Sequence, residues 1–145
     1  MHARQQIREA VVNALSGNVS ATVIDSRIWT RQTEELPLIG VYTASESVSL
    51  DEGASMGAPK LNRVVELVAE VSVIGATGKI SADALDTLAE EIEAAMPQEP
   101  AGASLNLVAS SEVEQSSDGE QIISNMAMTF ACIYRTASGA AGVLL

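Results

Sequence analysis

The stretch that decides the fold is LNRVVELVAEVSVI, residues 61–74. Its odd-numbered positions are apolar except Arg63, whereas its even-numbered positions mix Glu66 and Glu70 with valine, isoleucine and other polar residues. Because successive side chains of a β-strand point to opposite faces, this alternation predicts a long strand with one core face and one partly hydrated face. We therefore expect a sheet that buries the odd-numbered face of this strand.

One amphipathic helix is predicted before this strand in the sequence, and another after it. Residues 2–16 carry apolar side chains at helical spacing, and Gly17 can end that helix in a left-handed conformation. Residues 81–96 carry a second apolar stripe, for which Ser81 is the expected N-cap and Pro97 the expected end. The stripe consists of Leu85, Leu88, Ile92 and Met96, opposite Glu90, Glu91 and Glu93. Each helix thus offers one apolar face to a sheet.

Two shorter strands are predicted before residue 61. Residues 19–29 are rich in β-branched side chains, and residues 38–44 are almost continuously apolar. Residues 45–59 contain two glycines and a proline and are predicted to be a long connection. A loop of this length inside a domain is usually functional or mobile.

Residues 105–134 predict a hairpin. Its turn is Asp118-Gly119, a favoured two-residue hairpin sequence, so Ser117 is expected to face Glu120. The same register pairs Leu105 with Cys132, Leu107 with Phe130 and Ala109 with Met128. This register gathers apolar side chains on one face, which supports it.

The element order predicts an α+β fold. We expect a largely antiparallel or mixed sheet of about five strands, two helices packed mainly on one face and a C-terminal β-hairpin. Residues 1–136 are expected to form a single domain with a mobile loop at 46–60, and residues 137–145 a flexible tail.

The composition of the 145-residue chain excludes several classes of protein. It carries 8 Lys and Arg against 19 Asp and Glu, for a formal net charge of −11. This charge argues against a protein that grips nucleic-acid phosphates or docks on an anionic membrane surface. The single histidine, His2, and the single cysteine, Cys132, exclude a multi-histidine metal site, a Ser-His-Asp triad and an intrachain disulfide. No signal peptide or membrane span is expected, and a cytosolic setting fits.

No residue set has the pattern of a catalytic or cofactor site. The sequence GATGK at 75–79 lies between a strand and a helix, as a phosphate-binding loop must. However, Val73 stands where the first glycine is required, and Ile80 stands where a Ser or Thr ligand of Mg²⁺ is required. Neighbouring carboxylates are better explained as solvated faces than as acid–base pairs. We therefore expect no enzymatic activity, no metal and no cofactor.

Two groups of residues are candidates for protein contacts. Arg27, Trp29 and Arg31 alternate along one face of an extended segment. This pattern fits an amphipathic edge with snorkelling arginines and an interface hot spot equally well. Glu66 and Glu70 share one face of a strand, so they can line a channel or meet an arginine of the same or a neighbouring subunit.

The order of these segments resembles that of a known family. A helix with the sequence RQQIREAV (4–11) is followed by SRIW (26–29), an acidic linker and LPLIGVYT (36–43). The long strand, the acidic helix and the hairpin come next. This arrangement is similar to the tail terminator (minor tail protein U) family of long-tailed, lambda-like bacteriophages and prophages, across about residues 3–136.

The resemblance implies a structural virion protein. Proteins of that family assemble in the host cytoplasm as a hexameric ring at the head-proximal end of the tail tube. There they stop the addition of tube subunits and present a surface to head-completion proteins, while DNA passes through the ring without specific binding.

A ring needs two different patches on each subunit. The resemblance thus gives roles to the candidate residues. One patch would be formed by Arg27, Trp29 and Arg31, and the other by Glu90, Glu91 and Glu93. Glu66 and Glu70 are expected to line or border the lumen. The loop residues Asp51, Glu52 and Met56 are expected to contact a partner.

Two alternatives stay open at this point. One is a head–tail connector (neck) completion protein, or another minor tail component with a similar α+β domain. The other is a small cytoplasmic enzyme that uses carboxylates. Binding to tail tubes rather than to filled heads would separate the first alternative from a tail terminator, and a metabolite bound in a cleft would favour the second.

Overall fold

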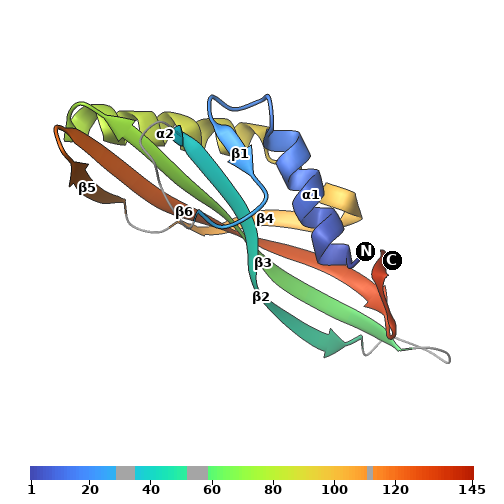
Figure 1. The fold of residues 1–145 in the computed structure, drawn as a ribbon. Coiled ribbons are helices and arrows are strands. Elements are labelled where there is room, and N and C mark those ends of the chain that lie inside the picture. Colours follow the sequence, from blue (N-terminus) through green and yellow to red (C-terminus); the bar gives the residue numbers. More distant parts are fainter. Residues whose placement is uncertain (29–34, 52–58, 111–112) are drawn as a thin grey trace.

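The computed structural model describes residues 1–28, 35–51, 59–110 and 113–145. These residues form an α+β fold, which confirms the predicted class (Figure 1). The elements in chain order are α1 (Ala3–Leu15), β1 (Thr22–Ile24), β2 (Leu38–Leu50), β3 (Lys60–Gly75), α2 (Gly78–Ala95), the short 3₁₀ helix η2 (Pro100–Gly102), β4 (Ser104–Ser110), β5 (Glu114–Asp118), β6 (Gln121–Ala137) and β7 (Ala140–Leu144).

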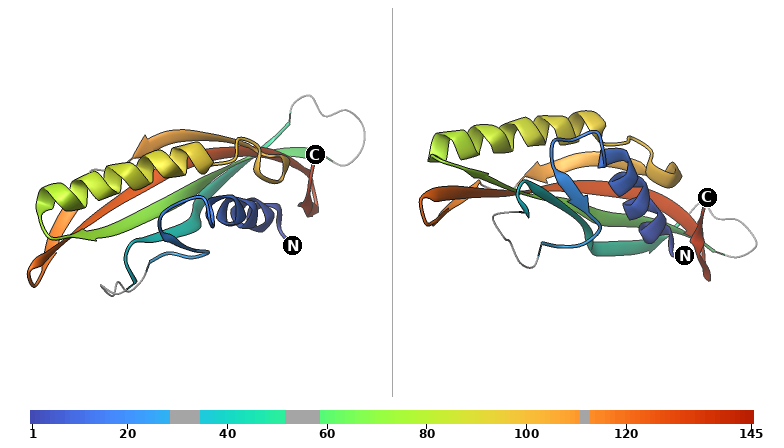
Figure 2. Two further views of the ribbon diagram at one scale, coloured as in Figure 1. Left: turned by 90° about the horizontal axis from the view of Figure 1, so that it is seen from above. Right: turned by 45° about the horizontal axis from the view of Figure 1, so that its top comes forward.

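The strands of the described residues form one seven-stranded mixed sheet. Its order is β1-β2-β3-β6-β4, and β5 and β7 also pair with β6. Only β1 and β2 run parallel; the other pairs are antiparallel. The long strands β3 and β6 pair along their whole length, and the sheet is strongly twisted and curled into a half-barrel (Figures 1 and 2).

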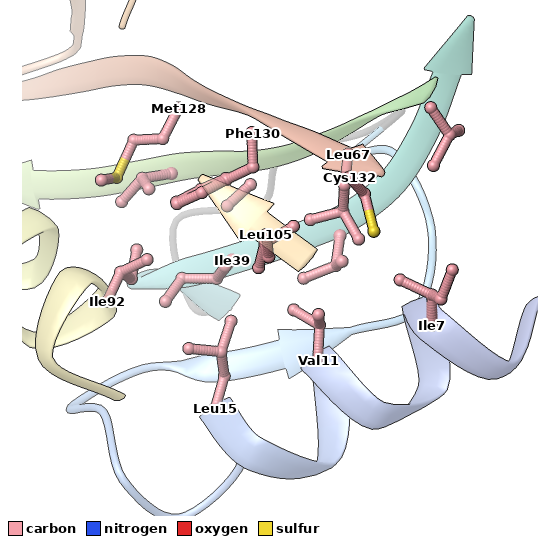
Figure 3. Packing of buried hydrophobic residues seen from close by; sticks show 14 of the residues in the cluster. Ile7, Val11, Leu15, Ile39, Leu67, Ile92, Leu105, Met128, Phe130 and Cys132 are labelled. Atoms are coloured by element: carbon pink, nitrogen blue, oxygen red, sulfur yellow. The ribbon is translucent and has the colours of Figure 1, made fainter. Parts of the chain in front are cut away.

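The core lies between the two helices and one face of this sheet, called here the covered face. The odd-numbered side chains of β3 from Val65 to Val73 are at most 1% exposed, as the alternation predicted. From the helices, Ile7, Val11 and Ile92 pack onto the same cluster (Figure 3). Cys132 of β6 is buried among them, and its burial raises the pKa of the thiol to about 12. The prediction of two helices on one face is confirmed.

The β5–β6 turn differs from the prediction by one residue. Asp118 pairs with Gln121, so Ser117 does not face Glu120. Gly119 then occupies the first central position of the turn, with a φ of +64°. Both hairpin turn types favoured by sheet twist need a positive φ there, which glycine adopts without steric cost.

Further from the turn, the predicted register returns. Leu105 pairs with Cys132, and Leu107 pairs with Phe130, as expected. A register shift between Leu107 and Ala109 then pairs Ala109 with Thr129, so its predicted pairing with Met128 is wrong. Beside the turn, β5 pairs with β6 two residues out of the predicted register, and the extra residue in β4 corrects one of these two.

Two segments predicted as loops are strands. Residues 46–50 continue β2, which stays paired with β3 up to Leu50 opposite Leu61. Residues 140–144 are not a free tail but form β7, which folds back on β6 through a turn at Gly139. The side-chain amide of Gln6 in α1 donates to the carbonyl oxygen of Gly142 at 2.7 Å, which fixes β7 against the first helix.

The N-cap of helix α2 lies four residues before the predicted N-cap Ser81. The N-cap is Thr77, whose hydroxyl oxygen accepts a hydrogen bond from the Ile80 N–H at 3.2 Å. Ser81 is buried and donates its hydroxyl to Ser124 of β6 at 2.6 Å. A Cβ on Gly75 would lie 2.7 Å from the Ser81 nitrogen. The GATGK sequence is therefore a tight strand-to-helix connection that requires glycine at its start.

Candidate functional site

The face of the sheet opposite the helices, called here the outer face, carries the two predicted lumen residues. Glu66 of β3 is exposed and lies opposite Ala131 of β6. Glu70 is half-buried and lies opposite Ala127. Within positions 64–74 of β3 and 123–133 of β6, these glutamates are the charged side chains on this face. The outer face of these two strands therefore carries aliphatic and small polar side chains together with two carboxylates.

Part of the outer face is covered by the segment that follows β1. The Ile28 N–H donates to the Glu70 carboxylate at 3.4 Å, and the Arg27 guanidinium lies 4.9 Å from the centre of the Tyr42 ring. A Cβ on Gly40 would lie 2.6 Å from the Ser26 carbonyl oxygen, so the segment crosses directly over this glycine. Glycine is required here because the two backbones approach each other closely.

This crossing creates a second, small apolar cluster. Ile28, Leu38 and Val68 are each at most 7% exposed but do not belong to the main core. The structure therefore brings the predicted contact residue Arg27 to the same face as the predicted lumen residue Glu70. Trp29 and Arg31 lie outside the described residues.

A charged cluster closes one end of the covered face. Glu46 of β2 accepts hydrogen bonds from Arg63 at 3.3 Å, from Arg4 at 3.2 Å and from the Tyr134 hydroxyl. Arg63 also donates to the Thr136 hydroxyl at 2.8 Å. The side chains of Glu46 and Arg63 are only 10% and 11% exposed, so this ion pair is largely withdrawn from water.

The β-bulge in β2 is the reason that Glu46 lies in this cluster. Thr43 pairs with Leu67 but Glu46 pairs with Val65, so β2 contains one extra residue between them. In a regular strand Thr43 and Glu46 would point to opposite faces, and the extra residue turns Glu46 to the covered face, where Arg63 points. Arg63 was predictable from the sequence as the exception on the core face of β3, whereas Glu46 was not, because the bulge breaks the alternation of β2.

The cluster changes the ionisation of its neighbours. Burial, followed by the hydrogen bond to Glu46, raises the pKa of the Tyr134 hydroxyl well above its usual range. Burial, followed by the charge of Arg4, lowers the pKa of His2, which caps α1 by accepting from the Arg4 N–H. Within the described residues, the cluster holds β2, β3, β6 and the start of α1 together.

The three predicted contact acids of α2 have different environments. Glu90 and Glu93 are exposed. Glu91 is half-buried and accepts hydrogen bonds from both the N–H and the hydroxyl of Ser20 at 2.8 Å. Glu91 thereby fastens the α1–β1 connection to α2. The structure does not bring these acids and Arg27 together within one chain, because they lie on opposite sides of the sheet.

The predicted partner-contacting residues belong to the β2–β3 connection. Asp51 forms an ion pair with Arg135 of β6, and its N–H donates to the Lys60 carbonyl oxygen at 2.9 Å. Glu52 and Met56 lie outside the described residues.

A cavity of about 570 Å³ lies between the end of α2 and β4. Leu105, Leu107 and Phe130 line its apolar side, and Glu93 and Glu99 lie at its acidic side. This cavity could not be predicted from the sequence, because it depends on how the connection after Pro97 passes over the edge of the sheet. Its lining can hold the apolar stem and the cationic end of a basic side chain.

In the described part of the chain, no group of three or more His, Cys, Asp or Glu side chains is placed to hold a metal ion, and no helix has the length and apolarity needed to cross a membrane. No protein-family model and no curated protein sequence matches this chain.

Proposed function

We propose that this chain is a structural subunit that closes into a hexameric ring at the head-proximal end of a phage tail tube. The ring stops further addition of tube subunits and offers a surface to the head-completion protein. Support comes from the ordered resemblance across residues 3–136 and from the α+β domain that this resemblance implies.

The carboxylates on the outer face are the structural feature that supports the proposal most directly. A tail lumen must let DNA slide, and carboxylates repel phosphates whereas lysines and arginines bind them. Glu66 is exposed on this face, and Glu70 lies two positions further along the same face, beyond Val68. We assign this face to the lumen of the ring.

The first test is negative-stain imaging of the purified protein with and without tail tubes. Rings at one end of the tubes are expected, together with loss of further tube growth. Binding to filled heads without binding to tubes would instead identify a neck protein. A chain that binds neither would contradict the proposal.

The second test separates the lumen assignment from ring formation. Glu66→Lys places a cation on the outer face, whereas Asp86→Lys makes an equal charge change on the exposed side of α2, outside the candidate contact residues. Both variants are expected to form rings. Only Glu66→Lys is expected to slow DNA passage, measured as DNA release from assembled particles. Equal release from the two variants would contradict the lumen assignment.

A further inference from the structure

The cavity between the end of α2 and β4 has an apolar floor that is open to solvent. Its volume is about 570 Å³. In the floor, Leu105 and Phe130 are 7% and 3% exposed, whereas Leu107 is 42% exposed. Leu107 pairs with Phe130 and therefore points to the covered face, but neither helix buries it. A ligand that enters the cavity thus gains apolar contacts that the folded chain itself does not supply.

The connection after α2 forms one wall of the cavity and is held in place by its own backbone. The Leu105 N–H donates to the Gln98 carbonyl oxygen at 3.0 Å, and the Gly102 N–H donates to the Glu99 carbonyl oxygen at 3.2 Å. Pro100, next to Glu99, is buried. Because this wall is already ordered, a ligand does not have to order it on binding.

Two carboxylates of the lining have no partner in the chain. Throughout the residues that the structure describes, the side chains of Glu93 and Glu99 form neither an ion pair nor a hydrogen bond. By contrast, Glu91 on the same helix is held by Ser20. The described lining contains no lysine, arginine or histidine. Charges of one sign beside apolar walls concentrate their field inside a cleft, so this cavity favours a cation.

The floor and the carboxylates together favour a basic side chain of a protein. Arginine and lysine pack an apolar stem on apolar surface while their charged end reaches a carboxylate. Gln98, Ser104 and Asn106 are exposed in the same lining and offer hydrogen-bonding groups to a peptide backbone. The volume lies in the range of about 300–1,000 Å³ that holds a drug-sized ligand, so it also has room for the neighbours of the basic residue.

The charges of the chain favour a different protein over a second copy. Five cations of the described residues each pair with a carboxylate of the same chain: Arg4, Arg8, Arg63, Lys79 and Arg135. The net charge of −11 also makes two copies repel each other at an acidic surface. A partner with an excess of basic residues has the complementary charge.

We infer that this cavity is the docking site for an arginine- or lysine-bearing segment of a basic partner protein. The stem of the basic side chain lies on Leu105, Leu107 and Phe130, and its charged end meets Glu93 and Glu99. The inference goes beyond the proposed ring, because the site is complete within one subunit.

Titration of the purified protein with n-butylguanidinium tests the chemistry of the site. This cation reproduces the arginine side chain, n-butylurea has nearly the same shape without the charge, and guanidinium has the charge without the stem. Ligand-observed NMR measures all three at low millimolar concentration. The butylguanidinium ion is expected to bind at least tenfold more tightly than either of the others. Equal binding of n-butylurea or of guanidinium would overturn the inference.

Variants of the lining place the binding in this cavity. Glu93→Gln with Glu99→Gln removes both charges, and Asp86→Asn with Glu114→Gln removes two exposed charges outside the lining. The first pair is expected to weaken n-butylguanidinium binding at least tenfold, and the second pair to leave it within twofold. Equal binding to both double variants would overturn the inference.

The apolar floor has its own pair of variants. Leu107→Ala shortens the exposed side chain of the floor, and Ile80→Ala makes the same change at an exposed position of α2 outside the lining. Only Leu107→Ala is expected to weaken n-butylguanidinium binding, by at least threefold. Urea unfolding of all four variants checks that they are folded. Unchanged binding to a folded Leu107→Ala chain would contradict the role of the floor.

Two further measurements identify the source of the cation. Arginine blocked as N-acetyl-arginine N-methylamide is expected to bind at least as tightly as n-butylguanidinium, because the cavity admits a peptide backbone. Tighter binding of putrescine, without binding of the blocked arginine, would identify a free diamine and overturn the protein partner. Self-association in sedimentation that Glu93→Gln with Glu99→Gln abolishes would identify a second copy and also overturn it. The ring on tail tubes is tested separately by imaging, so either result leaves the proposed function standing.

Discussion

The two faces of the sheet are formed by the same strands but differ in how much of their surface is buried. On the covered face, β3 and β6 bury their side chains under both helices in one continuous core. On the outer face, the same strands carry aliphatic and small polar side chains and two carboxylates, and one crossing segment buries only a few apolar side chains. Most of the buried apolar side chains therefore lie on the covered face, and the exposed part of the outer face can meet a ligand or border a channel.

The largest effect is expected from residues 66 and 67, which are neighbours on opposite faces. Leu67→Ala removes a fully buried side chain and leaves a cavity, so the free energy of unfolding should fall by about 3 kcal/mol. Glu66→Ala removes an exposed side chain and should change it by less than about 0.5 kcal/mol. Urea unfolding of both variants measures the difference, and similar losses would contradict the assignment of the faces.

A smaller effect is expected at the charged end of the covered face. Glu46→Gln leaves Arg63 and Arg4 without their carboxylate, so the free energy of unfolding should fall by about 2 kcal/mol. The control Glu90→Gln, on the exposed side of α2, should have almost no effect. Urea unfolding of both variants measures this difference. An unchanged free energy of unfolding in Glu46→Gln would show that the cluster is not needed to hold α1 on the sheet.

A substitution under the segment that crosses the outer face is expected to lower the free energy of unfolding by less than Glu46→Gln does. Gly40→Ala forces the Ser26–Ile28 segment to move, because the new Cβ would lie 2.6 Å from the Ser26 carbonyl oxygen. A loss of about 1 kcal/mol is expected, with faster amide exchange in residues 25–28 and unchanged exchange in β6. Ser47→Ala on the same strand is the control. Exchange that rises equally in β6 would mean that the crossing supports the whole sheet.

The smallest effect at neutral pH comes from two buried groups that titrate only in base. Burial raises the pKa of Cys132 from 9.0 to about 12, and the pKa of Tyr134 is also raised. The folded chain therefore holds these protons more tightly than the unfolded chain. Their contribution is complete below about pH 9 and is lost as the pH rises towards the folded values.

The pH dependence of urea unfolding between pH 7 and 11 measures this contribution. Cys132→Ala should flatten the decline above pH 9, and Tyr134→Phe should flatten it above pH 10. A decline that is identical in the parent chain and both variants would assign the alkaline effect to other groups.

Much of the fold could be predicted because it depends on local spacing. The alternation of β3 and the apolar stripes of α1 and α2 identified the covered face, and Asp118-Gly119 located the hairpin turn to within one residue. The acids of α2 were identified as a group, but the sequence did not show that Glu91 binds Ser20 while Glu90 and Glu93 stay exposed.

The sequence by itself determined the two helices, the long strand β3 and which face of β3 is apolar, since these follow from side-chain periods of 3.6 and 2 residues. Only the tertiary structure decided that Glu46 turns inward, that residues 140–144 pair with β6 and that Arg27 crosses to the outer face. These features depend on a bulge and on contacts between distant residues, whose partners leave no periodic signal in the chain.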